Sequence, residues 1–214
     1  MSERITAYDI GGFFRVEHQQ VPHKSKPYEF VTRIGAVTML PVALDAKGIP
    51  QAVVIKNERY HYGTSVNLPA GNLGGSIDRP EDPRRTALRE LREETGYGYP
   101  RGVAAAISMF RLREVSNSID YPRFFGVMHG VEYIGGQQAS DHEKITLQPI
   151  PLEDYIDPLL CLQRGETYPE VNAAFAKAGM ELGRSAITEW LVAPTEQNTA
   201  SIAESFAPWL VLGQ

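Results

Sequence analysis

Three glutamates, Glu90, Glu93 and Glu94, recur at helical spacing near the end of a predicted helix. Like charges three and four positions apart destabilise a helix by roughly 0.2–0.5 kcal/mol per pair, and anions in a last turn also oppose the helix dipole. A divalent cation reverses this cost, because Mg²⁺ prefers oxygen ligands such as carboxylates. The cluster therefore indicates a metal site. The alternative is a solvated acidic helix end, in which Arg89 and Arg92 partly neutralise the carboxylates.

The sequence around these glutamates also marks both helix ends. Asp82 is a suitable N-cap, and Pro83 suits the first helical position because of its fixed φ and missing N–H. Gly96 can end the helix in a left-handed conformation. A stripe of apolar residues recurs at helical spacing beside the acidic face: Ala87, Leu88 and Leu91. We predict an amphipathic helix that packs on one face and presents carboxylates on its neighbour.

The stretch from Gly75 to Tyr97 is similar to the signature of the Nudix hydrolase family at every fixed position. Five residues separate Gly75 from Glu81, and seven separate Glu81 from the run Arg89-Glu90-Leu91-Arg92-Glu93-Glu94. The resemblance implies that the three glutamates bind metal and that Arg89 holds and orients them. By the same likeness, Glu81 is the structural partner of Arg89, and the glycine after Thr95 ends the helix.

The Nudix resemblance implies an activity as well as a fold. The expected fold is an α/β/α sandwich with a mixed sheet, and the expected cofactor is Mg²⁺ or Mn²⁺. The expected reaction is hydrolysis of a nucleoside diphosphate linked to another moiety, which releases a nucleoside monophosphate. Because a pyrophosphate is polyanionic, cations are needed to neutralise its oxygens and to acidify an attacking water. The stretch Gly75–Tyr97 is called the box from here on. Its catalytic candidates are Arg89, Glu93 and Glu94.

Two earlier segments resemble the ADP-ribose pyrophosphatase branch of this family. Residues 1–32, with predicted strands at Phe13–Gln20 and Tyr28–Thr32, are similar to an N-terminal extension that often builds a dimer interface. A homodimer is therefore expected, although a simple edge hairpin is equally compatible with the pattern. The segment Asn57–Gly71 is similar to an arginine-tyrosine segment followed by Pro-Ala-Gly. This likeness favours ADP-ribose or another nucleotide sugar as substrate.

The second of these segments supplies binding candidates. By resemblance, Arg59 is a phosphate contact and Tyr60 or Tyr62 is a base platform, while a purely structural role is the alternative for each side chain. The carbonyl oxygen of Ala70 is a candidate metal ligand, since a backbone oxygen suits Mg²⁺.

Three features depart from the pattern of that branch. Asn67 stands where a glutamate is usual, and the box spacing starts at Gly75, so that the loop Gly71–Pro80 is four residues longer than expected. A proline typical of ADP-ribose-specific relatives is missing near Leu112, and the nearest one is Pro122. The longer loop is either mobile or a phosphate cradle built from backbone N–H groups. The substrate therefore stays open between ADP-ribose and other nucleotide sugars.

The loop Gly135–Ile145 contains two further acidic candidates, Asp141 and Glu143. It resembles the mobile acidic loop that supplies an additional metal ligand or the general base in ADP-ribose pyrophosphatases. A carboxylate within one water of the metal can take a proton from the nucleophile. The alternative is that both side chains are simply solvated.

The remaining pattern alternates strands and helices and ends in a helical segment. The predicted strands after the extension are Arg33–Leu44, Ile49–Lys56, Gly102–Leu112, Arg123–Ile134 and Ile145–Ile150. The predicted helices are Leu152–Leu162, Pro169–Ala178, Glu181–Val192 and Thr195–Phe206. We expect an N-terminal extension at 1–32, a Nudix domain at 33–163, and a helical appendage at 164–214 packed on that domain.

The composition of the chain limits the kinds of molecule that it is expected to bind. The chain has 21 basic and 26 acidic residues, so we expect no broad basic surface for nucleic acid or an anionic membrane. The single cysteine, Cys161, excludes an internal disulfide framework. No apolar run of about 18 residues and no cleavable leader are recognisable, and a cytoplasmic protein is expected. Two other functions stay open: a house-cleaning nucleoside triphosphate pyrophosphatase, and a non-hydrolysing sensor of nucleotide sugars.

Overall fold

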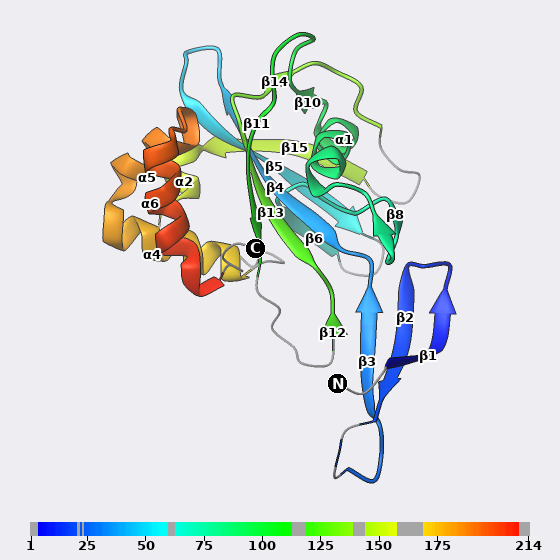
Figure 1. The fold of residues 1–214 in the computed structure, drawn as a ribbon. Coiled ribbons are helices and arrows are strands. Elements are labelled where there is room, and N and C mark those ends of the chain that lie inside the picture. Colours follow the sequence, from blue (N-terminus) through cyan, green and yellow to red (C-terminus); the bar gives the residue numbers. More distant parts are fainter. Residues whose placement is uncertain are drawn as a thin grey trace.

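The computed structural model describes residues 4–20, 22, 24–59, 63–112, 119–138, 144–157 and 169–209. Its centre is a seven-stranded mixed sheet between two helical layers (Figure 1). Helix α1 (Pro83–Thr95) covers one face, and the C-terminal helices cover the other. This arrangement confirms the predicted α/β/α class. None of the helices in the described ranges is long and apolar enough to span a membrane.

The main path of the central sheet runs in the order β11-β13-β4-β5-β15. These strands are β4 (Ala36–Leu44), β5 (Pro50–Arg59), β11 (Ala106–Arg111), β13 (Arg123–His129) and β15 (Lys144–Pro151). Strands β13 and β4 are parallel, and the other neighbours are antiparallel. All but the last residue of β4 is buried, as expected for a nearly continuous apolar strand covered on both faces.

Strands β4 and β5 pair only near the turn that joins them. Beyond it, β7 (Ala70–Asn72) pairs with the first part of β4, and β6 (Gly63–Asn67) pairs with the last part of β5. The sequence analysis did not predict β6 or β7. Their position brings the Pro-Ala-Gly segment into the sheet beside α1.

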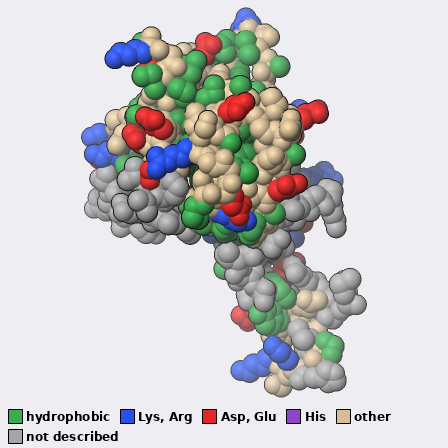
Figure 2. Space-filling model, turned by 90° about the vertical axis from the view of Figure 1, so that its left-hand side faces the viewer, with side chains coloured by type: hydrophobic (Ala, Val, Ile, Leu, Met, Phe, Trp, Pro, Cys, Tyr) green, Lys and Arg blue, Asp and Glu red, His purple; other side chains and the backbone are tan. Residues whose placement is uncertain are grey.

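A second, smaller sheet projects from the body of the molecule (Figures 1 and 2). It contains β1 (Arg4–Ile10), β2 (Phe14–Gln19), β3 (Tyr28–Arg33) and β12 (Ile119–Asp120). The predicted strands correspond to β2 and β3, whereas β1 was not predicted. β3 leads into β4, and β12 leads into β13, so two adjacent chain segments connect the sheets.

Glycine is required at the junction of the two sheets. A Cβ added at Gly35 would lie 2.7 Å from the carbonyl oxygen of Pro122 and 2.8 Å from Leu73 Cδ1. The neighbouring Ala36 N donates to that same Pro122 oxygen at 2.9 Å. The close approach fixes where the small sheet leaves the large one.

The C-terminal helices pack on the sheet face opposite α1. They are α2 (Leu152–Tyr155), α4 (Pro169–Leu182), α5 (Arg184–Val192), α6 (Glu196–Phe206) and the 3₁₀ turn η1 (Ala207–Trp209). Trp190 is fully buried among these helices. The helix predicted at Leu152–Leu162 is described only as the short α2.

One predicted helix boundary is wrong. Gly179 was expected to separate two helices, but α4 runs through it to Leu182. The break falls at Gly183, whose φ of 82° lies in the left-handed region that glycine adopts most easily. A glycine inside a helix lowers its stability without ending it, so composition alone did not locate the break.

Candidate active site

Helix α1 has both of its predicted ends. The carboxylate of Asp82 accepts a hydrogen bond from Arg84 N at 2.8 Å, and Pro83 occupies the first helical position. Gly96 has a φ of 71° and donates its N–H to Arg92 O at 2.9 Å. These local caps fix where the helix begins and ends.

The apolar stripe of α1 faces the sheet. Ala87 and Leu91 are fully buried against β4, and Leu88 packs at the edge of the same cluster. The acidic residues therefore lie on the neighbouring face, beside β7. The face that packs dictates where the carboxylates point.

One guanidinium gathers the carboxylates of the box. Arg89 Nη1 donates to Glu90 Oε1 at 2.7 Å and to Glu93 Oε2 at 3.0 Å. Arg89 Nη2 lies 3.6 Å from Glu81 Oε2, within ion-pair distance. Arg89, which the resemblance implies to hold and orient the carboxylates, thus contacts two of the three glutamates. It also contacts Glu81, its implied structural partner.

Glu81 is bonded to both the loop and the helix. Its carboxylate accepts from Thr86 Oγ1 at 2.8 Å, and its backbone N–H donates to Gly74 O at 2.7 Å. The hydrogen bond from Thr86 and the charge of Arg89 together hold the pKa of Glu81 below its ordinary value. Glu81 therefore stays ionised and can act as a fixed anchor for Arg89.

The third glutamate has a different partner. Ala70 N donates to Glu94 Oε2 at 2.9 Å, which ties the end of α1 to β7. Next to it, Gly71 leaves space for Glu90, because an added Cβ would lie only 2.1 Å from Glu90 Cδ. The sequence analysis named the Ala70 carbonyl but missed the Ala70 amide and the packing role of Gly71. The Pro-Ala-Gly motif was the available signal.

Burial changes the chemistry of Glu90. Its side chain is 17% exposed, and this desolvation raises its pKa above the ordinary value, although Arg89 opposes the shift. A half-buried carboxylate close to a second carboxylate gains more from a bound cation than a solvated one does. The geometry thus favours a positively charged ligand at this face.

Comparisons with known proteins agree with this geometry. A segment of 84 residues, 38% of this chain, is 39% identical to ADP-ribose pyrophosphatase of Bacillus subtilis (strain 168) and covers 41% of it. The fold is shared with a solved ADP compounds hydrolase, at a TM-score of 0.53 and 16% identity over 73% of this chain and 80% of the other. The box residues, the helix that carries them and this fold are together similar to those of Nudix hydrolases.

Two further relatives show how varied the proteins similar to this chain are. It is 36% identical over 85 residues to the methanol dehydrogenase activator of Bacillus methanolicus, covering 39% of this chain and 42% of that protein. It is 30% identical over 110 residues to a CMP-5'-(N-acetyl-N-hydroxy-3-aminopropyl)phosphonate hydrolase of Streptomyces rubellomurinus (strain ATCC 31215), covering 51% and 50%. The matches span half the length of these relatives or less. No family model matches the chain.

The donor set of the three glutamates on α1 fits a hard divalent cation. Glu90, Glu93, Glu94 and the carbonyl of Ala70 offer only oxygen ligands, as Mg²⁺ or Mn²⁺ requires. Among the described residues, no three acidic, histidine or cysteine side chains converge in ligand geometry. The reason is visible in the contacts, since Glu90 and Glu93 turn to Arg89 while Glu94 turns to Ala70 N. A cation held by all three glutamates would therefore require their side chains to leave these partners.

The C-terminal end of the Nudix helix is capped by a distant loop. Gln138 N donates to Glu93 O at 2.8 Å, and Gln137 Nε2 donates to Glu94 O at 2.9 Å. The N–H groups of Ile134 and Gly135 both donate to Gly96 O. These residues begin the loop that resembles the mobile acidic loop of ADP-ribose pyrophosphatases, and its described part is bonded to α1. Unsatisfied carbonyls at the helix end were the available signal.

Several predicted site residues lie outside the described residues. These are Tyr60, Tyr62, Asp141 and Glu143. The backbone of Arg59 belongs to β5 and pairs with Gly63, but its side chain is not described. Their roles stay predictions.

A cavity of about 300 Å³ opens at the start of the Nudix helix. Glu81 lies on its wall, together with Arg33 and Arg111. The guanidinium of Arg33 also lies 4.9 Å from the ring centre of Tyr121. The apolar part of the wall includes Ile34, Leu73, Ile77, Pro83, Pro122 and Phe124. Sequence reasoning did not identify this cavity, because its residues come from five separate segments.

Proposed function

We propose that this chain is a metal-dependent Nudix pyrophosphohydrolase that cleaves a nucleoside diphosphate linked to another moiety. The products are a nucleoside monophosphate and a phosphorylated remainder. One observation carries the proposal: Arg89 gathers Glu90 and Glu93 on a helix face whose third glutamate is bonded to Ala70. Such a concentration of carboxylates costs free energy unless a cation compensates it.

Each box residue has a role in this proposal. Glu90, Glu93, Glu94 and the carbonyl of Ala70 hold Mg²⁺ or Mn²⁺. When bound, this metal neutralises phosphoryl oxygens and lowers the pKa of the attacking water. The N–H of Ala70 orients the carboxylate of Glu94.

Arg89 keeps the carboxylates of Glu90 and Glu93 close together before metal binds, with Glu81 as its anchor. Asp141 or Glu143 is the proposed general base, and Arg59 a proposed phosphate contact, as the family resemblance implies. Tyr60 is the proposed base platform.

ADP-ribose or another nucleotide sugar is the proposed substrate. The relative from Bacillus subtilis bears the name ADP-ribose pyrophosphatase, and the N-terminal extension is present as a separate sheet. The cavity with Arg33 and Arg111 combines apolar walls with two cationic side chains. That combination suits an uncharged ring attached to an anion.

We also propose that the chain forms a homodimer through its N-terminal sheet. A row of directly opposed apolar residues crosses all four strands: Tyr8, Val16, Val31 and Ile119. Opposed residues share one face of a sheet, and Tyr8 is 60% exposed and Ile119 44% exposed. Because such a face is costly in water, a second copy is the proposed cover.

The dimer is tested with Tyr8→Glu, studied by sedimentation or light scattering. A charge in this row should convert a wild-type dimer into monomers, whereas Glu29→Gln should not, since Glu29 is already polar. A wild-type monomer at all accessible concentrations would contradict the dimer without affecting the hydrolase proposal.

The reaction itself is tested with a panel of ADP-ribose, other nucleotide sugars, NADH, dinucleoside polyphosphates and nucleoside triphosphates in the presence of Mg²⁺. Products are separated by chromatography. Preferential cleavage of one nucleotide sugar to two monophosphates supports the proposal. Release of pyrophosphate from a triphosphate identifies the triphosphatase alternative, and binding without any product identifies the sensor.

A further inference from the structure

We propose that Arg15, in the N-terminal sheet, is a positioning residue for the Nudix carboxylates. It acts through Asp78 and the hairpin that precedes Glu81. The inference rests on the proposed metal site, but it concerns a residue more than seventy positions away from the glutamates in the sequence. It also gives a purpose to the four extra residues of the loop Gly71–Pro80.

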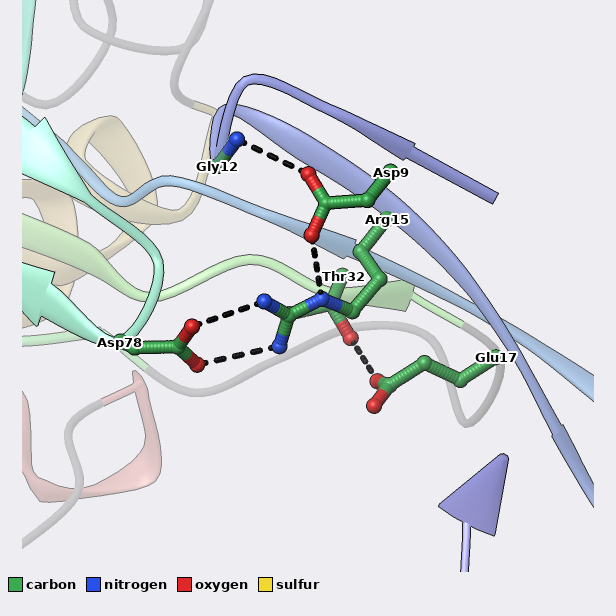
Figure 3. A network of polar contacts seen from close by, with 6 residues as sticks. All are labelled: Asp9, Gly12, Arg15, Glu17, Thr32 and Asp78. Atoms are coloured by element: carbon green, nitrogen blue, oxygen red, sulfur yellow. Dashed lines mark hydrogen bonds and ion pairs between the residues drawn. The ribbon is translucent and has the colours of Figure 1, made fainter. Parts of the chain in front are cut away.

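The first contact is a double hydrogen bond between distant segments (Figure 3). Arg15 Nη1 and Nη2 donate to the two carboxylate oxygens of Asp78 at 3.0 and 2.8 Å. Arg15 Nε donates to Asp9 Oδ2 at 2.9 Å, and the other oxygen of Asp9 accepts from Gly12 N at 2.8 Å. The Arg15 side chain is only 17% exposed, so this fork is fixed on both sides.

These groups carry opposite charges at neutral pH. The hydrogen bond from Arg15 lowers the pKa of the Asp78 carboxyl, and the bonds from Gly12 and Arg15 lower that of Asp9. Removing the guanidinium would therefore leave two carboxylates without their shared cation. A surface ion pair alone contributes little to stability. A guanidinium that bonds one carboxylate through two nitrogens and a second carboxylate through the third also fixes the geometry of all three groups.

A second contact joins the same two segments through the backbone. Ile77 N donates to Gly12 O at 2.7 Å, and a Cβ on Gly12 would lie 2.8 Å from Ser76 Cβ. Gly12 also has a φ of 75°, which disfavours any other residue. The turn between β1 and β2 thus fits closely onto the loop before the Nudix helix.

The partner of this turn is a minimal hairpin. It consists of β8 (Gly75–Ser76) and β9 (Arg79–Pro80), joined by Ile77 and Asp78. A two-stranded hairpin has marginal stability by itself, so external contacts must determine its position. In the described residues, the extra length of the loop forms a docking element for the N-terminal sheet.

The hairpin leads directly into the metal site. Glu81 follows Pro80 in the chain, its N–H is bonded to Gly74 O across the base of the hairpin, and its carboxylate pairs with Arg89. Arg89 in turn holds Glu90 and Glu93. A shift of the hairpin therefore moves Glu81 and weakens the anchor of Arg89.

The test compares Arg15→Ala with wild-type protein in three measurements. Mn²⁺ affinity without substrate should fall by about threefold to tenfold, less than the roughly tenfold to hundredfold loss for groups bonded directly to metal ligands, because Arg15 acts through Asp78 and Glu81. The Mg²⁺ concentration for half-maximal turnover should rise by the same factor, with kcat at saturating Mg²⁺ nearly unchanged. Amide exchange should accelerate at Ile77 and Glu81 but not at Leu91, which lies in the core of α1.

Matched variants sharpen this test. Asp78→Asn, which keeps the shape of the side chain, should reproduce the effect. The double variant should lose no more Mn²⁺ affinity than Arg15→Ala, because both changes remove the same interaction. Arg15→Lys should restore part of the metal affinity. Arg79→Ala removes an exposed charge from the same hairpin and should leave all three measurements unchanged.

Each outcome separates the two proposals. Unchanged Mn²⁺ affinity in Arg15→Ala, with only a lower melting temperature, would overturn the positioning role and leave the hydrolase proposal intact. Absence of hydrolysis by wild-type protein, with the Mn²⁺ and exchange effects present, would overturn the proposed reaction and support the positioning role.

Discussion

The two faces of the central sheet are built in different ways. On the face of the C-terminal helices, twenty buried residues of the described ranges form one cluster. Within it, ring contacts join Phe125 to Phe175, Phe175 to Phe206, and Phe206 to Trp190. On the α1 face, the buried cluster has eight members, all aliphatic or methionine. Large rings bury more apolar area per residue, so the helical face contributes most of the packing free energy.

The α1 face is held by polar bonds at its functional end instead. Ala70 N binds Glu94, Arg89 binds Glu90, and Gln138 N caps the Glu93 carbonyl. Such bonds fix direction but add little net stability. We infer that packing on the aromatic face supplies most of the stability. The α1 face can therefore carry a cluster of carboxylates whose mutual repulsion destabilises the fold. Four experiments test this division.

The largest stability effect is expected from Trp190→Ala. Trp190 is fully buried and contacts His129 and Phe206, so its truncation should lower the free energy of unfolding by about 3–5 kcal/mol. Denaturant titration measures the change, and Met180→Ala, at a position 74% exposed, is the control. Turnover of the folded fraction should stay normal. A loss smaller than that of the control would contradict the division.

Gly71→Ala should lower turnover while leaving stability nearly unchanged. The new methyl group would overlap Glu90, so this carboxylate must rotate away from its place against β7. We expect turnover to fall about tenfold to a hundredfold, or about 1.4–2.7 kcal/mol in activation free energy, with little change in unfolding. Gly48→Ala is the opposite control: its new methyl group meets open space, but its φ of 77° disfavours alanine, so it should lower stability and leave turnover unchanged. Full activity of Gly71→Ala would show that this contact is unimportant.

A smaller effect is expected from His129, which links the sheet to α5. Its Nδ1 lies 2.9 Å from Leu191 O and must donate to it, so Nε2 accepts from Ser108 Oγ at 2.9 Å. Burial lowers the pKa of His129, although the bond to Leu191 opposes the shift. The neutral ring therefore belongs to the folded state.

The sign of the pH dependence follows from this shift. Below the ordinary pKa of about 6.5 the unfolded chain binds a proton that the folded chain does not, so stability falls as the pH decreases. The slope from this one group is at most about 1.4 kcal/mol per pH unit. Denaturant titrations at pH 5 to 7 should show a shallower slope for His129→Gln than for wild-type protein. Parallel curves would exclude His129 as the source.

Local signals predicted much of the fold. The caps at Asp82 and Gly96 define α1 because each acts on its own neighbours in sequence. The central strands were recognisable because near-continuous apolar runs must be covered on both faces. Strand β1 and the β8–β9 hairpin were missed, because their positions depend on partners from other segments, such as β2 for β1 and Arg15 for Asp78.

The candidate site was predictable only in part. The spacing of the box gave Glu90, Glu93 and Glu94, but it could not show that two turn to Arg89 and one to Ala70. Side-chain direction depends on groups from other segments. The glutamine caps at 137 and 138 were invisible for the same reason, because no local pattern links them to α1.

The central claim is that the carboxylates beside β7 hold the metal that drives hydrolysis. The most direct test is turnover of the preferred substrate by Glu94→Gln in saturating Mg²⁺, with thermal unfolding measured in parallel. The glutamine oxygen can still accept from Ala70 N, so the fold should be unchanged. We predict that turnover falls about a hundredfold or more, at least about 2.7 kcal/mol in activation free energy. Near-normal turnover in this variant would contradict the assignment.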